Sequence, residues 1–135
     1  MKKIFLLLIP VIFAVSCTTT FSGSKTTPEK KDNNKIVSQK EDNGEYELII
    51  IDNNFDRWYI ISGHQYSNMS NEFYQTWNRL GAISWNSYYM QNRYSRVIEN
   101  SIDYDSNINY GLEFNKKLYC YFKFIEERYG IRLLR

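Results

Sequence analysis

The sequence predicts a small single α/β domain with the element order strand, helix, strand, helix, preceded by a signal peptide and a flexible tether. Three observations predict this fold class. The composition turns abruptly apolar and aromatic near residue 45, two short segments have the patterns of strands, and two longer segments have the apolar spacing of helices. Residues 45–135 have the usual size of one domain. We therefore expect two helices packed on a minimal sheet within this range.

The first residues have the pattern of a bacterial export signal. Lys2 and Lys3 precede an apolar run over residues 4–15, which is shorter than the roughly 20 residues of a membrane-spanning helix. Small residues then lead directly into Cys17, as they do before the lipidated cysteine of a lipoprotein. We predict that residues 1–16 are a lipoprotein signal peptide and that Cys17 is lipidated. The alternative is cleavage at another position, with Cys17 an incidental thiol.

Residues 17–44 are predicted to be the lipidated N-terminus and a disordered tether. The segment is rich in Thr, Ser, Lys, Asn and acidic residues, and it has almost no large apolar side chains whose burial could offset the entropy of ordering. No acidic residue follows Cys17 directly. We therefore expect an outer-membrane anchor with the domain facing the periplasm.

Charge and cysteine content exclude two classes of protein. The formal net charge is +2, and without Lys2 and Lys3 the 17 basic residues become 15, equal to the 15 acidic ones. Nucleic-acid binding needs a basic surplus, so we expect no nucleic-acid partner. There are 2 cysteines, and if Cys17 is lipidated, Cys120 has no partner for a disulfide. A domain stabilised by a framework of disulfides is therefore excluded.

The first predicted strand covers residues 46–52, an apolar and β-branched run that ends in the polar turn of residues 52–54. A short helical or irregular segment follows from Phe55. A sheet of two strands is only marginally stable alone, so residues 58–62 are a candidate for a third strand, as an alternative to the helical or irregular segment.

The first long helix is predicted from Ser70, its N-cap, to about Gln91. Gly81 lies beside the apolar face, so it marks either a close packing contact or a kink. The spacing of three and four residues assigns that face to Phe73, Trp77, Leu80, Ser84 and Tyr88.

The second half of the domain predicts one more strand and one more helix. Residues 96–104 alternate between apolar and polar side chains, which indicates a half-buried strand. Residues 110–129 have a helical apolar stripe that ends at Gly130, a residue suited to cap a helix. Strands joined through a helix are usually parallel neighbours, so we expect a parallel pair. The stripe consists of Phe114, Leu118, Tyr121, Phe122, Ile125 and Tyr129.

Several segments of the domain carry a resemblance to a known family. They are residues 45–52 with Phe55 and Trp58, Trp85-Asn86, residues 102–105, Ile108, Tyr110-Gly111, and Leu118 with Tyr121-Phe122. In these stretches the chain resembles a family of small Bacteroidota lipoproteins that is assigned to a domain of unknown function. The resemblance extends over nearly the whole domain, and it implies a location in the cell envelope and no known activity.

One segment has a weak likeness to a metal site. Asp103, Asp105 and Asn107 place oxygen ligands at alternate positions, as the start of an EF-hand calcium loop does. Ile108 replaces the glycine that the loop needs, and Phe114 replaces its bidentate glutamate. We therefore expect an Asx-rich turn before the last helix, and neither a metal nor another cofactor.

The sequence contains no recognisable catalytic set. His64 is the only histidine and lies in a predicted loop, while Cys120 lies on the last helix with nothing that lowers its pKa. We therefore expect a protein that is not an enzyme. The enzymatic alternative requires a pocket that brings His64 or Cys120 to a carboxylate such as Asp103 or Asp105.

Aromatic residues make up 17% of the chain, and they support two binding hypotheses. The first is a protein-interaction module with an exposed patch of Trp85, Tyr89 and Phe124 that contacts an envelope protein. The alternative is glycan or peptidoglycan binding, in which one of these rings stacks on a sugar.

Overall fold

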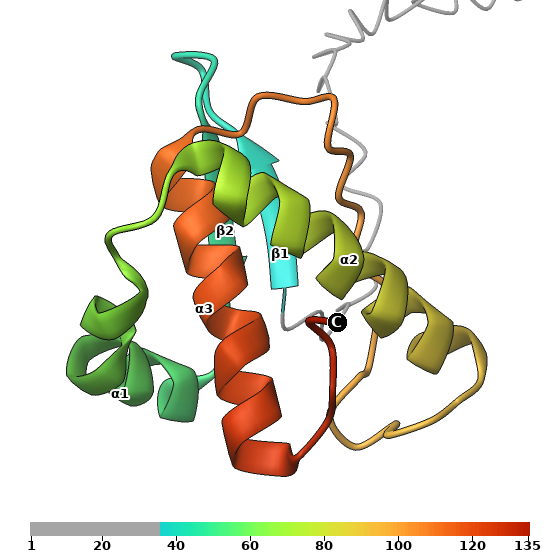
Figure 1. The fold of residues 1–135 in the computed structure, drawn as a ribbon. Coiled ribbons are helices and arrows are strands. Elements are labelled where there is room, and N and C mark those ends of the chain that lie inside the picture. The colour runs from blue at the N-terminus through green and yellow to red at the C-terminus, as the bar shows by residue number, and fades with distance from the viewer. Residues whose placement is uncertain (1–35) are drawn as a thin grey trace, which may run out of the picture. The chain divides into compact units, whose positions relative to one another are not determined.

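The computed structural model describes residues 36–135 and confirms a small single-domain α/β fold (Figure 1). Residues 1–16, Cys17 and the tether as far as residue 35 lie outside the described part. No helix in the described part combines the length and apolar character needed to cross a membrane. The elements are β1 (Ile36–Lys40), β2 (Tyr46–Ile50), α1 (Asn53–Ser62), the 3-10 helix η1 (Gly63–Tyr66), α2 (Asn71–Met90) and α3 (Leu112–Tyr129).

The sheet is an antiparallel hairpin, so the predicted parallel pair is wrong. β1 pairs with β2 in a register that places Ser38 opposite Leu48. The connecting turn is closed by a hydrogen bond of 2.8 Å from the Glu45 N–H to Asn43 Oδ1, and Gly44 has a φ of +86°. β1 and this turn lie inside residues 17–44, so the tether prediction is wrong for residues 36–44.

The segment after β2 is α1, so the alternative third strand at residues 58–62 is wrong. Asp52 caps this helix, because its Oδ1 accepts hydrogen bonds from the N–H groups of Asn54 (2.9 Å) and Phe55 (3.2 Å). Phe55 is completely buried and anchors α1 against the last helix.

α2 follows the prediction in its bounds and differs in its buried face. Ser70 is the N-cap, and its hydroxyl accepts a hydrogen bond from the Phe73 N–H. The buried face lies about one position further along than predicted, so Phe73, Trp77 and Leu80 are only partly buried. It consists of Tyr74, Asn78, Gly81, Ala82, Trp85 and Tyr88.

Gly81 is a close packing contact and not a kink. A Cβ atom at this position would lie 2.5 Å from two carbons of the Phe122 ring, and α2 is continuous through it. The absence of a side chain thus allows α2 to approach α3 closely.

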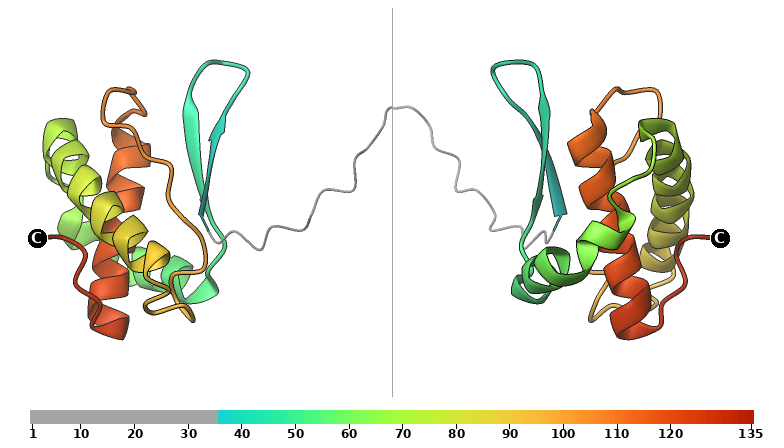
Figure 2. Two further views of the ribbon diagram at one scale, coloured as in Figure 1. Left: turned by 90° about the vertical axis from the view of Figure 1, so that its right-hand side faces the viewer. Right: turned by 60° about the vertical axis from the view of Figure 1, so that its left-hand side comes forward.

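α3 is the central element and is buried on nearly all sides. It contacts α1, η1, α2 and β2, and Figure 2 shows the hairpin along one side of the helices. Gly130 ends α3 in the left-handed conformation with a φ of +67°, as predicted. Tyr129, which was assigned to the apolar stripe, is 43% exposed.

Candidate functional site

Residues 96–104 do not form the predicted strand. The predicted alternation of burial is present, because Ile98 and Ile102 are buried while Glu99 and Asp103 are exposed. The backbone, however, pairs with side chains of α2 and, among residues 36–135, with no strand. Trp85 Nε1 donates to the Asn100 carbonyl at 2.7 Å.

Asn86 completes this contact by acting as a short strand partner. Its Nδ2 donates to the Ile102 carbonyl at 2.8 Å, and its Oδ1 accepts from the Ile102 N–H at 2.8 Å. Tyr104 donates from its hydroxyl to Asn115 Oδ1 at 2.9 Å. Side chains from two helices therefore hold the segment at Asn100, Ile102 and Tyr104.

These contacts overturn the predicted aromatic patch. Trp85 is 1% exposed and Phe124 is 1% exposed, so both are core residues. Phe124 is covered because α1 packs on that side of α3, with the Phe55 ring centroid 5.6 Å from its own. Of the three patch residues only Tyr89, at 43%, reaches solvent.

A cavity of about 200 Å³ lies between β1 and residues 100–104, and we call it the slot. β1 forms one wall and the extended segment forms the other. The slot is lined by Ile36 and Ser38 of β1, Leu48 of β2, residues 100–104, and Phe114 and Leu118 of α3. Its floor is apolar, and no residue of α2 lines it.

The β1 wall presents backbone groups that the hairpin does not use. Glu41 donates its N–H to the Glu45 carbonyl at 2.8 Å, so these two residues are a hydrogen-bonded pair of the antiparallel ladder. This pair fixes which residues of β1 direct their N–H and C=O groups toward β2 and which direct them away from it. In this alternation the N–H and C=O of Ser38 point outward. On the opposite edge of the hairpin, the carbonyl of its partner Leu48 also points outward and accepts from Lys117 Nζ at 2.8 Å.

The second wall is complementary. In extended backbone, successive residues direct their polar groups to opposite sides, and Ile102 directs both of its groups to α2. Ser101 and Asp103 therefore face the slot. Within residues 36–135, the N–H of Ser101 and both backbone groups of Asp103 have no hydrogen-bond partner. Asn100 Oδ1 is also buried without one.

The calcium-like segment forms a turn. Asp105 Oδ1 accepts from the Asn107 N–H at 2.9 Å and from Asn107 Nδ2 at 2.8 Å, which is the predicted Asx turn. Asp103 lies on the wall of the slot instead. No cluster of three His, Cys, Asp or Glu side chains suited to a metal occurs among the described residues.

The two candidate catalytic residues have different environments. Cys120 is completely buried, and burial raises the pKa of its thiol from 9.0 to about 12. His64 is exposed on η1. The Cys120 thiol therefore stays protonated at neutral pH and has little nucleophilic character.

Cys120 is expected to react slowly with thiol reagents in the folded protein. A pKa of about 12 instead of 9.0 reduces the thiolate about a thousandfold at pH 8, and burial adds a steric block. In a Cys17→Ser variant, where Cys120 is the only thiol, alkylation at pH 8 should be at least ~100-fold slower without urea than in 8 M urea. Raising the pH from 8 to 9 should accelerate the reaction about tenfold without urea, where the pH is far below the pKa of the thiol, and only about fivefold in urea. Equal rates would show that Cys120 is accessible.

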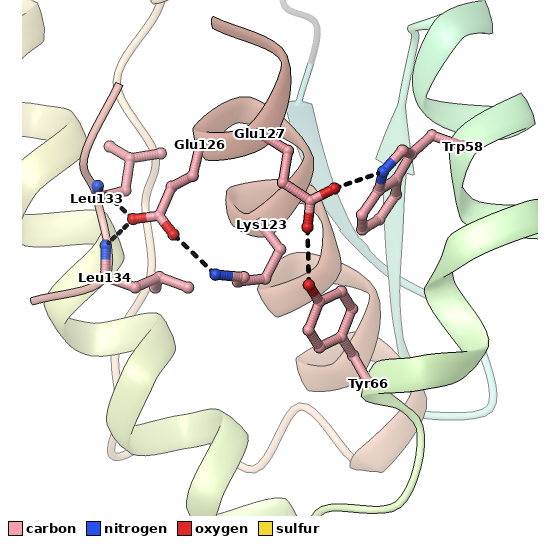
Figure 3. Close-up of polar contacts among 7 residues, drawn as sticks. All are labelled: Trp58, Tyr66, Lys123, Glu126, Glu127, Leu133 and Leu134. Atoms are coloured by element: carbon pink, nitrogen blue, oxygen red, sulfur yellow. Dashed lines mark hydrogen bonds and ion pairs between the residues drawn. The ribbon is translucent and has the colours of Figure 1, made fainter. Parts of the chain in front are cut away.

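Two glutamates of α3 hold neighbouring segments in place (Figure 3). Glu127 accepts from Trp58 Nε1 at 3.0 Å and from the Tyr66 hydroxyl at 2.7 Å, which joins α1 and η1 to α3. Burial, the larger cause, and the Glu127 carboxylate together raise the pKa of the Tyr66 hydroxyl.

Glu126 holds the C-terminal tail. Its Oε1 accepts from the N–H groups of Leu133 and Leu134, both at 2.9 Å, and its Oε2 pairs with Lys123 Nζ at 3.0 Å (Figure 3). Sequence patterns did not predict the contacts of Glu127 with α1 and η1 or those of Glu126 with the C-terminal tail, because these contacts join α3 to other segments.

Asn86→Ala is expected to release the slot wall and to lower the free energy of unfolding by about 1–3 kcal/mol. The change leaves the Ile102 N–H and C=O without their partner. Hydrogen exchange should show the Ile102 amide losing protection, and urea unfolding should give the free energy. Gln91→Ala is the matched control, because the Gln91 side chain is exposed and, within the described part of the chain, bonds only to Ser87. Unchanged exchange at Ile102 would contradict the assignment.

Comparison with known proteins assigns the chain to a family. A model of a family of unknown function (DUF6146) matches residues 4–135, which covers nearly the whole chain. No curated protein and no solved structure matches it. The predicted resemblance to a family of unknown function is therefore confirmed at this level. The chain belongs to the family of unknown function DUF6146.

Proposed function

We propose that this protein is a lipid-anchored lipoprotein of the cell envelope that binds another protein through the slot and is not an enzyme. The observation that carries the proposal is the pair of facing backbone walls over an apolar floor. Polypeptide is the ligand class that such unpaired N–H and C=O groups bind, as in β-strand addition to a sheet edge.

The N-terminal sequence, residues 1–17, supports the proposed lipid anchor. The basic pair, the apolar run of residues 4–15 and the following Cys17 have the order of a lipoprotein signal. The family match begins at Ile4 and so includes both the run and Cys17. Several acyl chains on one cysteine bind a membrane more strongly than the marginal single-chain case. We place the anchor in the outer membrane, facing the periplasm, because no acidic residue follows Cys17.

The composition of the slot supports binding over catalysis. Its lining includes one carboxylate, that of Asp103, and neither a histidine nor a cysteine. General acid–base or nucleophilic catalysis needs at least two such groups in mutual reach. The buried Cys120 thiol lies outside this lining.

The aromatic rings give less support to glycan binding. Trp85 and Phe124 are buried, and a sugar stacks on a ring face that is open to solvent. Trp58, which lies beside the Glu127 carboxylate, stacks on Phe55 and on Tyr66.

The test is chemical crosslinking in intact cells, followed by pull-down through a tag joined to the C-terminus by a flexible linker. We expect one dominant co-purifying protein, identified by mass spectrometry, and its loss in a Cys17→Ala variant. Labelled palmitate should enter the wild-type protein and not the variant. Recovery of peptidoglycan fragments alone, or of nothing, would overturn the proposed protein-binding role. Absence of palmitate labelling would overturn the anchor.

A further inference from the structure

We propose that the partner enters the slot as a single extended strand between β1 and residues 100–104, and that it carries an apolar residue followed by a basic one. This inference rests on the proposed function and deepens it, because it states the class of partner and the mode of binding. It is argued from the two walls, from the floor and from the charge of the lining.

The two walls select a single strand. Ser38 presents its N–H and C=O from β1, and Asp103 presents its own from the facing segment. A strand between them pairs on both of its sides, so it must have two free edges. β1 of a second copy is already paired with β2 and offers one free edge only. A second hairpin therefore does not satisfy both walls.

The floor selects an apolar side chain. Leu48, Phe114 and Leu118 line it, and all three are buried. The cavity of about 200 Å³ has room for one medium-sized side chain together with the backbone that bears it. Burying a side chain of the Val, Leu or Phe class there excludes water from the slot.

The lining selects a basic neighbour. Side chains alternate between the two faces of a strand, so the residue next to the apolar one points outward. Asp103 is exposed on that side, is the only charged residue of the lining, and has no ion pair within the described residues. A lysine or arginine at this position is electrostatically complementary to it.

The preceding tether of the same chain does not fit this description. Between Thr18 and Lys35 the only apolar side chains are those of Phe21 and Pro28, and neither is followed by a basic residue. Proline has no N–H to donate to a wall. The occupant is therefore a segment of another protein.

Site-specific photocrosslinking of the full-length protein in intact cells tests the inference. A benzophenone amino acid replaces Ser101 on one wall, and Ser38 on the other wall is changed to proline or to alanine. Ser38→Pro removes an outward N–H that takes no part in the β1–β2 ladder, while Ser38→Ala retains it. We expect adducts on one short segment of the partner, with a yield that falls about tenfold in Ser38→Pro and less than about twofold in Ser38→Ala.

Charge reversal gives a second measurement, which holds if Ser38→Pro does not fold. Asp103→Lys should reduce the yield about fivefold through like-charge repulsion with the basic residue of the partner. Asp56→Lys, at an exposed acidic position outside the slot, is the matched control and should leave the yield unchanged.

The outcomes separate the inference from the proposed function. A partner that still depends on Cys17 but is captured equally well in Ser38→Pro and Asp103→Lys would overturn the strand insertion and leave the proposed function standing. Adducts on residues 18–35 of the same chain, or on a second copy, would also overturn it. Absence of any partner in the pull-down would overturn both.

Discussion

Trp85→Ala is expected to lower the free energy of unfolding by about 4 kcal/mol, a large part of the 5–15 kcal/mol typical of a whole protein. The Trp85 ring is 1% exposed and packs against Tyr121 and Phe122, with ring centroids 5.9 and 6.2 Å away. The change also leaves the Asn100 carbonyl without its donor. Urea unfolding followed by far-ultraviolet circular dichroism measures the loss without depending on tryptophan fluorescence.

Two variants make this result specific. Trp77→Ala, on the same helix, removes a ring that is only partly buried and should cost less than half as much. Trp85→Phe retains most of the apolar volume and loses the Nε1 donor, so it should cost about 1–2 kcal/mol. Equal losses for Trp85→Ala and Trp77→Ala would contradict the burial of Trp85 and would favour the predicted exposed patch.

The misplacement of Trp85 has a physical cause. Hydrophobicity favours the helix face of Phe73, Trp77 and Leu80, yet the buried face includes Asn78 and Gly81. Asn78 is buried because its Nδ2 donates to the Asn115 carbonyl at 2.8 Å. Gly81 is buried because it admits a ring from α3. Neither reason can be read from apolar periodicity, whereas the ends of α2 and α3 could be predicted from Ser70 and Gly130, whose roles are local.

β1 was missed although a signal for it is present. Asn43-Gly44 is a favoured hairpin turn, and it separates Ile36–Lys40 from Tyr46–Ile50 by the length of a short loop. The polar surroundings of β1 masked this signal, because only Ile36 and Val37 are apolar in the strand. Composition averaged over a long window therefore predicted a disordered tether. Pairing with the apolar strand β2 instead makes residues 36–40 a strand.

The slot itself could not have been predicted from the sequence. The alternation in residues 96–104 correctly indicated which side chains are buried. It could not indicate that Asn86 replaces a neighbouring strand on one side. The other side faces β1, an element distant in sequence, and the groups that meet there are backbone atoms, which every residue type shares.

Gly81→Val is expected to lower the free energy of unfolding by about 3 kcal/mol, because it forces α2 away from α3. The Cβ alone would lie 2.5 Å from two carbons of the Phe122 ring and 3.1 Å from a methyl of Leu134. Phe122 is completely buried, so its ring has no free space into which to move. The gain in helix propensity from replacing glycine is only about 0.4 kcal/mol and does not offset the overlap. Thermal and urea unfolding of the purified variant measure the loss.

Pairing Gly81→Val with Phe122→Leu distinguishes this overlap from a defect in the helix. Phe122→Leu alone should cost about 1–2 kcal/mol through lost packing, and in its presence Gly81→Val should cost at least ~1 kcal/mol less than in the wild type. Arg79→Val, at an exposed position of α2, measures what a β-branched residue costs in this helix and should change stability by less than about 0.5 kcal/mol. Strict additivity of Gly81→Val and Phe122→Leu would show that the two positions are not in contact. The close approach of α2 and α3 would then have another cause.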